Sequence, residues 1–314
     1  MITVVRIGTR GSPLALWQAR TVASLLESRG GRIEILTIKT AGDRLQERPH
    51  AAAGTSGKGV FVKEIEDALL AGHIDVAVHS AKDMSAALPD GLTIAGVLPR
   101  ADPRDALVVR DATAGRPFAD LVARLGGSPL IATSSVRRSA QLSSLIADAR
   151  FVPIRGNVDT RLRKLDAGDF NALVLAAAGM MRLGYAVRIS APIPVELCTP
   201  APGQGIVAVE TRADDRGVRT LIEPISDAAA AVCFDAERTL VSALGGGCQL
   251  PLGALAVPTA EGRIHMRAIV TSLDGHRSIR RDGEGAADRA ADLGRRLADE
   301  LAKAGAAAIL DEVR

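Results

Sequence analysis

The sequence predicts an α/β protein of two lobes, followed by a small α+β domain with a three-stranded sheet. Short apolar runs alternate with helical patterns, Pro- and Gly-rich breaks interrupt them at 99–105 and 199–205, and the pattern changes after Gly217. Two such breaks indicate a chain that leaves its first lobe, builds a second and returns. We therefore expect a discontinuous first lobe (1–98 with 200–220), a second lobe (104–198) and a third domain (224–314).

The composition is that of an ordinary globular protein, with 314 residues, 47% hydrophobic and 24% charged. A net charge of +3 and an aromatic content of 2% provide neither a strong positive field nor many stacking platforms for nucleic acid. The longest apolar run, at 172–181, is too short to span a bilayer, and the N-terminus enters a strand pattern rather than a signal peptide. We therefore expect a cytoplasmic protein without nucleic-acid or membrane partners.

The elements of the first lobe follow from apolar runs and capping signals. Ser12 and Pro13 are typical of a helix start, so a helix is predicted from Pro13 to about Ser28. Residues from Phe61 to Leu69 have helical spacing, and Gly72 ends that pattern. Strands are predicted at 4–7, 33–38, 74–78 and 92–98 and, after the second break, at 206–209.

The segment 41–59 has no apolar period and is expected to form a lid loop that contains Lys58. Its glycines superficially resemble a phosphate-binding P-loop. However, Ala52 stands at the first glycine position, and Gly59 stands where Ser or Thr would hold magnesium. We therefore exclude a nucleotide site in this segment.

The second lobe repeats the alternation, and the third domain does not. Strands are predicted in the second lobe at 106–109, 131–133, 151–154 and 173–175, each of the last three followed by a helix. In the third domain, helices at about 227–243 and 286–304 flank alternating segments at 252–257 and 264–273. Gly275 marks a hairpin turn, which completes a domain of three strands and two helices.

Polar residues follow five of the predicted strands. Because ligands of α/β sheets bind beyond the carboxyl ends of the strands, this recurrence predicts a cationic site with a carboxylate nearby. Arginine forks suit carboxylates or phosphates, so the expected ligand is a polyanionic small molecule. Arg137 and Arg138 also oppose the dipole of the helix that they begin, which favours an anionic ligand there, although a surface pair is an alternative. The groups are Arg10 with Ser12, Ser80 with Lys82 and Asp83, Ser135 with Arg137 and Arg138, Arg155 with Arg161, and Arg182.

The three cysteines, Cys198, Cys233 and Cys248, have no spacing typical of a metal site or a disulfide framework, and we expect no metal. Cys248 follows three glycines that allow close approach, so it is a candidate nucleophile or attachment point, with a buried structural cysteine as the alternative. Cys198 and Cys233 are expected to be structural.

Seven ordered motifs, spread over essentially the whole chain, resemble those of the porphobilinogen deaminase family. They include Arg10-Gly11-Ser12-Pro13-Leu14, Gly57-Lys58-Gly59-Val60-Phe61, His79-Ser80-Ala81-Lys82-Asp83, Thr133-Ser134-Ser135-Val136-Arg137-Arg138, Arg155-Gly156-Asn157, Pro202-Gly203-Gln204-Gly205 and Gly247-Cys248-Gln249. The resemblance implies two lobes like those of type II periplasmic binding proteins and a small third domain. It also implies a dipyrromethane cofactor, joined by a thioether to Cys248. The implied activity is stepwise deamination and condensation of porphobilinogen into hydroxymethylbilane.

The resemblance also implies roles for individual residues. Asp83 would stabilise the cationic pyrrole intermediates, as an anion held ready where positive charge develops. Phe61, Ala176 and Gln204 would line the pocket, and Lys58 would lie in the lid. The residues expected to bind cofactor and growing oligopyrrole are Arg10, Ser12, Ser80, Lys82, Thr133, Ser135, Arg137, Arg138, Arg155, Gly156, Arg161 and Arg182.

The sequence departs from the family pattern around its central motif, where Ala81, Met84 and Ser85 replace the usual Met, Val and Pro. Loss of that proline affects the expected stiffness of the loop rather than the chemistry of Asp83. Two other hypotheses stay open at this point. One is a non-catalytic, two-lobed binding protein for a polycarboxylate or oxyanion, and the other is the effector-binding part of a transcription factor. A monomer is expected.

Overall fold

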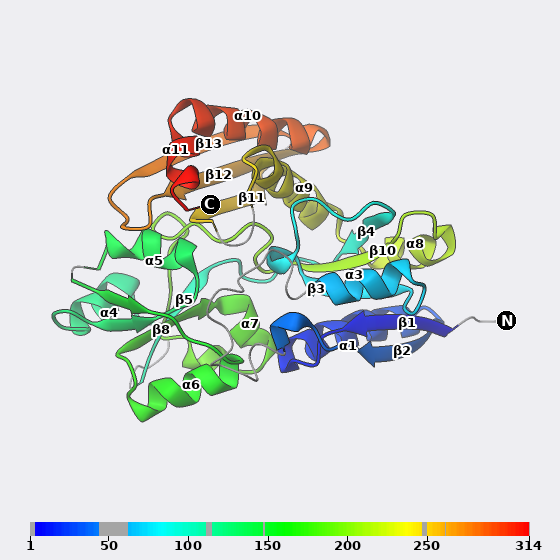
Figure 1. The fold of residues 1–314 in the computed structure, drawn as a ribbon, viewed down its shortest axis with the longest axis horizontal. Helices are drawn as coiled ribbons and strands as arrows, with labels where there is room; N and C mark the ends of the chain where they lie inside the picture. Colours follow the sequence, from blue (N-terminus) through cyan, green and yellow to red (C-terminus); the bar gives the residue numbers. More distant parts are fainter. Residues whose placement is uncertain are drawn as a thin grey trace. The chain divides into compact units, whose positions relative to one another are not determined.

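The computed structural model describes residues 4–43, 62–110, 115–146, 148–246, 250–260 and 262–313. The chain forms two compact units (Figure 1), one of residues 1–100 with 206–231 and the other of residues 101–205 with 232–314. The first unit contains one five-stranded sheet, and the second contains a five-stranded and a three-stranded sheet. The predicted division into three domains stays a prediction.

The first lobe is a mixed sheet in the order β2-β1-β3-β10-β4, covered by helices on both faces. Strand β1 is parallel to β2 and β3, whereas β10 returns after the second lobe and lies antiparallel between β3 and β4. The elements are β1 (Val4–Thr9), α1 (Pro13–Glu27), β2 (Arg32–Thr37), α3 (Lys63–Leu70), β3 (Val76–Ser80), η2 (Ala81–Asp83), β4 (Leu92–Val97), β10 (Val207–Arg212), α8 (Arg216–Ile222) and η4 (Glu223–Ile225).

The alternation of side chains along the strands builds a core on each face of this sheet. Ile7 and Val76 pack with Val22 and Leu26 of α1 on one face, whereas Ala77 lies in the cluster that contains α3 on the other. Gly8 is required by close packing, because a Cβ at this position would lie 2.3 Å from Cδ1 of Ile74. A sheet buried on both faces explains the near-continuous apolar runs in the sequence.

The second lobe repeats this arrangement, with the strand order β7-β6-β8-β5-β9. Strand β6 is parallel to β7 and β8, and β5, the first strand after the crossover, is antiparallel to both β8 and β9. Both sheets therefore have three parallel strands in the order second, first, third, then an antiparallel strand that adjoins a crossing between the lobes (β10 or β5), and then one edge strand (β4 or β9). This is the topology of type II periplasmic binding proteins. The elements are β5 (Asp105–Val109), α4 (Phe118–Arg124), β6 (Leu130–Ala132), α5 (Val136–Ser143), β7 (Arg150–Val152), α6 (Val158–Ala167), β8 (Ala172–Ala176), α7 (Ala177–Arg182), η3 (Ala186–Arg188) and β9 (Ala191–Pro192).

The C-terminal part is an antiparallel sheet in the order β11-β12-β13, with helices packed on its apolar face. Its elements are α9 (Ala228–Ala243), β11 (Leu252–Pro258), β12 (Arg263–Thr271), β13 (Ser278–Ala286), η5 (Ala287–Arg289), α10 (Ala290–Lys303) and α11 (Ala306–Asp311). Three strands were expected and are found. The expected helix at 286–304 begins later, at Ala290, because β13 continues to Ala286, and Gly305 at φ +97° separates an additional helix, α11.

Within the described ranges, no helix combines the length and the apolarity that crossing a membrane requires.

Three titratable side chains are buried together in the first lobe. His79 Nε2 lies 3.0 Å from Oε2 of Glu210, and Glu66 of α3 is also buried. Burial, reinforced by the negative charge of Glu210, raises the pKa of Glu66 from 4.5 to about 6, whereas the neighbouring His79 acts in the opposite direction.

This shift predicts a pH-dependent effect of Glu66→Gln on stability. The folded state holds the Glu66 proton more tightly than the unfolded state, so stability is lost as pH rises from 4.5 to about 6. Glutamine has no charge to bury. At pH 7 the free energy of unfolding of the variant should therefore exceed that of the wild-type protein, by at most about 2 kcal/mol. Below pH 4.5 this advantage should disappear.

Urea unfolding at pH 4 and pH 7 checks this prediction, with the exposed Glu27 changed to Gln as the control. An equal shift at both pH values would show that the proton on Glu66 is not responsible.

Candidate active site

The carboxyl ends of β1, β2 and β3 share one edge of the first sheet, because these strands are parallel. The structure thereby brings together the predicted residues that follow these strands. We call this group the first polar edge: Arg10, Ser12, Ser80, Lys82 and Asp83.

Arg10 forms an ion pair that the sequence did not predict. Its Nη2 lies 2.5 Å from Oδ1 of Asp43, whose Oδ2 also accepts hydrogen bonds from the backbone and hydroxyl of Thr40. Burial alone would raise the pKa of Asp43, but these hydrogen bonds hold it below its usual value. The spacing Thr40-x-x-Asp43, which resembles a capping box, was the available signal in the expected lid.

The hydroxyl groups of the first polar edge have structural partners. Ser12 caps α1, as predicted, because its Oγ accepts a hydrogen bond from the backbone N–H of Ala15 at 3.3 Å. Ser80 Oγ accepts one from Nε2 of Gln18 at 2.8 Å, a contact that the sequence did not reveal. The bond between Gln18 and Ser80 links α1 to the end of β3.

Asp83 ends the short 3₁₀ turn η2 and is exposed. The turn is fixed at both ends: Ala81 donates its N–H to Ile206 O at 3.1 Å, and Met84 donates to Ala81 O at 3.2 Å. Ala81 and Met84 are buried, so two of the three departures from the family pattern are accommodated by packing. An exposed carboxylate on a fixed turn is well placed to meet a ligand.

The second sheet has a corresponding edge, because β6, β7 and β8 are also parallel. Strand β5 is antiparallel to β8, so its first residue, Asp105, pairs with Ala176 at the same edge. We call the predicted residues at or after the ends of these strands the second polar edge: Thr133, Ser135, Arg137, Arg138, Arg155, Gly156, Arg161, Ala176 and Arg182.

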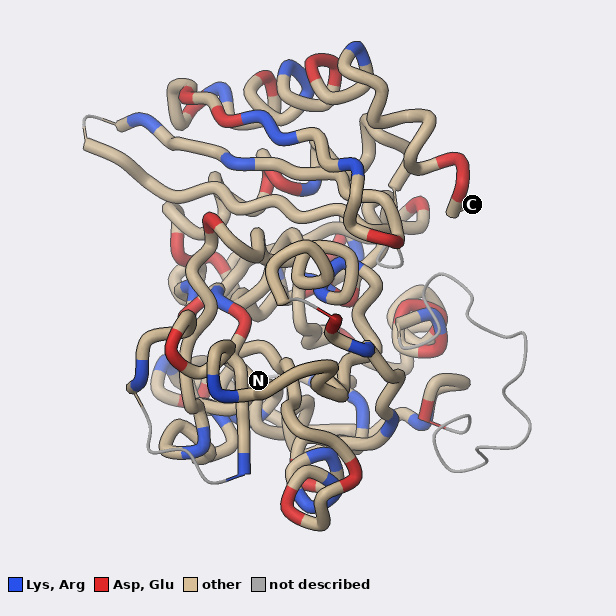
Figure 2. Tube along the Cα trace, turned by 90° about the vertical axis from the view of Figure 1, so that its left-hand side faces the viewer, with Lys and Arg blue, Asp and Glu red and all other residues tan. Residues whose placement is uncertain are grey.

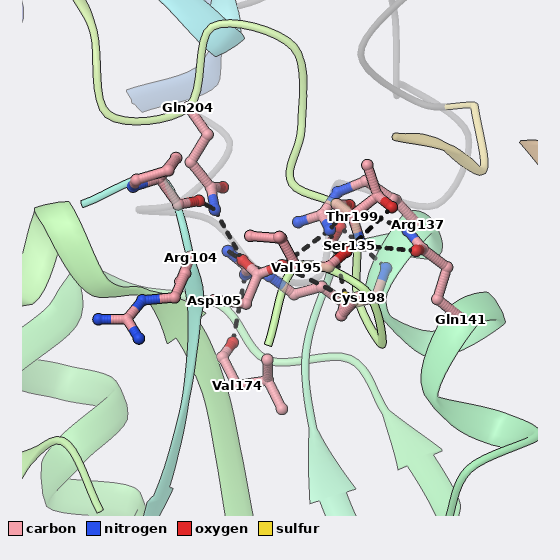
Figure 3. A network of polar contacts seen from close by, with 12 residues as sticks. Arg104, Asp105, Ser135, Arg137, Gln141, Val174, Val195, Cys198, Thr199 and Gln204 are labelled. Atoms are coloured by element: carbon pink, nitrogen blue, oxygen red, sulfur yellow. Dashed lines mark hydrogen bonds and ion pairs between the residues drawn. The ribbon is translucent and has the colours of Figure 1, made fainter. Parts of the chain in front are cut away.

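Arg137 and Arg138 are the second and third residues of α5, whose N-cap is Ser135, and both are buried. Both arginines form ion pairs with Asp105, and Figure 3 shows the network of polar contacts around Asp105 and Arg137. Nη1 of Arg137 lies 2.7 Å from Oδ2 of Asp105, and Nε of Arg138 donates to Oδ1 at 2.8 Å. The sequence predicts an anionic ligand beside these two arginines, and the structure shows that Asp105 already provides an anion there.

Gln204 and Cys198 complete this network. Nε2 of Gln204 lies 2.9 Å from Oδ1 of Asp105 and 2.7 Å from the carbonyl oxygen of Pro103. Burial alone would raise the pKa of Asp105, but the two guanidinium groups and these hydrogen bonds hold it well below its usual range. Burial and the adjacent carboxylate raise the pKa of Cys198 to about 12, so its thiol is inert, in agreement with a structural role.

The remaining arginines of the second polar edge differ in exposure: Arg155 is exposed, whereas Arg161 and Arg182 are partly buried. Arg161 donates a hydrogen bond from Nε to the carbonyl oxygen of Gly156 at 2.8 Å. Arg182 donates to the carbonyl oxygen of Gly205 at 2.7 Å, and burial lowers its pKa. Gly156 has φ +107°, and a Cβ there would lie 2.9 Å from Cγ2 of Thr160, which explains the glycine.

Basic and acidic residues are interspersed along the chain rather than collected in one part (Figure 2). With a net charge of only +3, the positive potential of the two polar edges is therefore local. Lys58, Phe61 and Cys248 lie outside the described residues. Among the described residues, no group of His, Cys, Asp and Glu could hold a metal ion.

Fold and edges together define a two-lobed α/β protein of the type II binding-protein class, with cationic and hydroxyl groups at the strand ends of both lobes. Residues 5–220 match the family model "Porphobilinogen deaminase, dipyromethane cofactor binding domain", and residues 231–303 match its C-terminal domain. The chain belongs to the porphobilinogen deaminase family, a family of transferases.

Relatives named porphobilinogen deaminase match over nearly their whole length. The chain is 43% identical to that of Syntrophobacter fumaroxidans over 312 residues, covering 99% of this chain and 98% of the relative. It is 45% identical to that of Syntrophomonas wolfei, covering 99% of each. Among solved structures, a double mutant of the VFT2 domain of Bordetella pertussis BvgS matches with a TM-score of 0.40 and 18% identity, covering 71% of this chain and 86% of that one.

Proposed function

We propose that the protein deaminates four porphobilinogen molecules and joins them head to tail on a covalent dipyrromethane primer, then releases hydroxymethylbilane by hydrolysis. Family membership supports the reaction. The observation that carries the assignment of residues is the position of Asp83, an exposed carboxylate on a fixed turn at an edge that also holds Arg10 and Lys82.

The donor groups of both polar edges fit an acidic oligopyrrole. Each pyrrole unit carries two carboxylates, which guanidinium, ammonium and hydroxyl groups can bind through charge-assisted hydrogen bonds. We propose that the arginines, Lys82, Ser12, Ser80, Thr133 and Ser135 bind these carboxylates, with Ala176 and Gln204 lining the pocket. Phe61 and Lys58 lie outside the described residues, so their expected roles rest on the sequence resemblance alone. A chain that lengthens by two carboxylates per cycle requires such a bank of cations.

The dipyrromethane group would be joined to Cys248 by a thioether, and it supplies a pyrrole α-carbon nucleophile. Asp83 would face the pyrrole N–H of the bound substrate and stabilise the positive charge that develops as ammonia leaves. An anion already in place needs no reorganisation at that moment, so it lowers the barrier to the step. Arg10 and Lys82 would hold the substrate carboxylates and orient the ring.

We also propose that the protein acts as a monomer, because all the proposed binding residues belong to one chain. We propose in addition that it acts in the cytoplasm. Sedimentation velocity and cell fractionation test these two points.

Incubation with limiting porphobilinogen should produce a ladder of evenly spaced covalent adducts in the intact mass spectrum. The unreacted protein should already exceed the mass of its chain by two pyrrole units and give a colour with Ehrlich's reagent. An Asp83→Asn variant should carry the two units but form no ladder. Protein of unmodified mass that binds porphobilinogen without consuming it would instead support a non-catalytic binding protein.

A further inference from the structure

We infer that Asp105 is a positioning residue, an internal anion that sets where Arg137 and Arg138 present their guanidinium groups. The inference rests on the proposed function, because it assigns a task to residues that the proposal places in ligand binding. Asp105 itself is fully buried, and it pairs with both arginines from the first position of β5.

Asp105 is the centre of a buried ion-pair network that contains two arginines. Each carboxylate oxygen accepts from a different guanidinium group, at 2.7 Å from Arg137 and 2.8 Å from Arg138. Both arginines are at least nine-tenths buried, with exposed fractions of 4% and 6%. A buried charge without a partner is strongly unfavourable, so these side chains cannot leave the carboxylate without cost.

The helix alone would not hold the two arginines there. Both lie in the first turn of α5, where the partial positive charge of the helix N-terminus opposes cations. Asp105 compensates for that repulsion. Two guanidinium groups around one carboxylate leave a single net positive charge, which suits one acidic side chain of a ligand.

The carboxylate of Asp105 also connects Arg137 and Arg138 to the two chain segments that lead from one unit to the other. The first of these segments contains residues 101–103 and the second contains residues 204–205. Gln204, from the second connecting segment, donates to Asp105 and to Pro103 of the first. The two segments also meet where Ala101 donates to Gly205 O at 3.0 Å, the carbonyl that accepts from Arg182. A change at Asp105 therefore affects the support of three proposed ligand-binding arginines.

Asp105→Asn tests this role, because asparagine keeps the shape but removes the charge that both guanidinium groups require. We expect the KM for porphobilinogen to rise by about 10- to 100-fold, since misplaced binding groups act on substrate capture. Asp105→Glu keeps the charge and should recover part of this loss. The matched control is Asp102→Asn, which removes a carboxylate of the same segment that pairs with Arg104.

The readouts are kcat, KM, the intact mass and the thermal midpoint of each variant. A purely structural role would lower the thermal midpoint and the active fraction but leave KM unchanged, and this result would overturn the inference. An equal rise in KM for Asp102→Asn would also overturn it. If Asp105→Asn does not fold, KM for Asp105→Glu is compared with that for Asp102→Glu, and equal values overturn the inference. A wild-type protein that does not consume porphobilinogen would instead refute the proposed function.

Discussion

Replacing Asp83 with alanine should lower kcat for porphobilinogen by at least about 10²-fold, the usual cost of losing a preorganised electrostatic group. The turn that carries Asp83 is held by the backbone of Ala81 and Ile206, so the side chain can be removed without disturbing the fold. Substrate binding should persist, because the cationic groups of both polar edges are unchanged. Single-turnover kinetics with measured binding separates the two effects.

Asp90→Ala is the control, since Asp90 is an exposed carboxylate in the turn before β4. It should leave kcat unchanged. Near-normal turnover by Asp83→Ala would remove Asp83 from the proposed mechanism.

Replacing Cys248 with serine should give a protein whose intact mass is that of the chain alone and whose turnover is lost. Serine cannot form the thioether, and its hydroxyl is a much weaker nucleophile than a thiolate. Mass spectrometry of the purified protein, followed by incubation with porphobilinogen, measures both outcomes.

Cys233→Ser is the matched control, because Cys233 is a buried cysteine of α9 that the proposal does not use. It should retain the two pyrrole units. Finding them still covalently attached to Cys248→Ser protein would refute the attachment site.

Much of the fold could be predicted because its signals are local. Ser12 and Pro13 mark the start of α1, and the Pro- and Gly-rich breaks mark the two crossings between lobes. The polar residues after the strands could be grouped as well, since parallel strands place their carboxyl ends at one edge. The start of α10 was misplaced because β13 continues through Glu284 and Gly285, which have no strand signal.

The partners of the site residues could not be predicted, because they depend on distant pairings. Asp105 resembles the polar start of a strand, and nothing near it in sequence indicates that it binds arginines more than thirty positions away. The dipole of α5 indicates an anion beside Arg137 and Arg138, but it does not distinguish a ligand from a carboxylate of the chain itself. Asp43 lay in the expected lid, and Glu66 resembles an ordinary residue of an amphipathic helix.

The position of β10 has a consequence for how the protein can be divided. The strand fills the gap between β3 and β4, although it is made only after the whole second lobe. A fragment that ends at Arg100 would therefore have two separated pieces of sheet and open backbone groups along both. Fragment complementation of the first unit therefore requires residues 206–231 to be supplied in trans. During synthesis, the second lobe must be complete before β10 can pair with β3 and β4 to finish the first sheet.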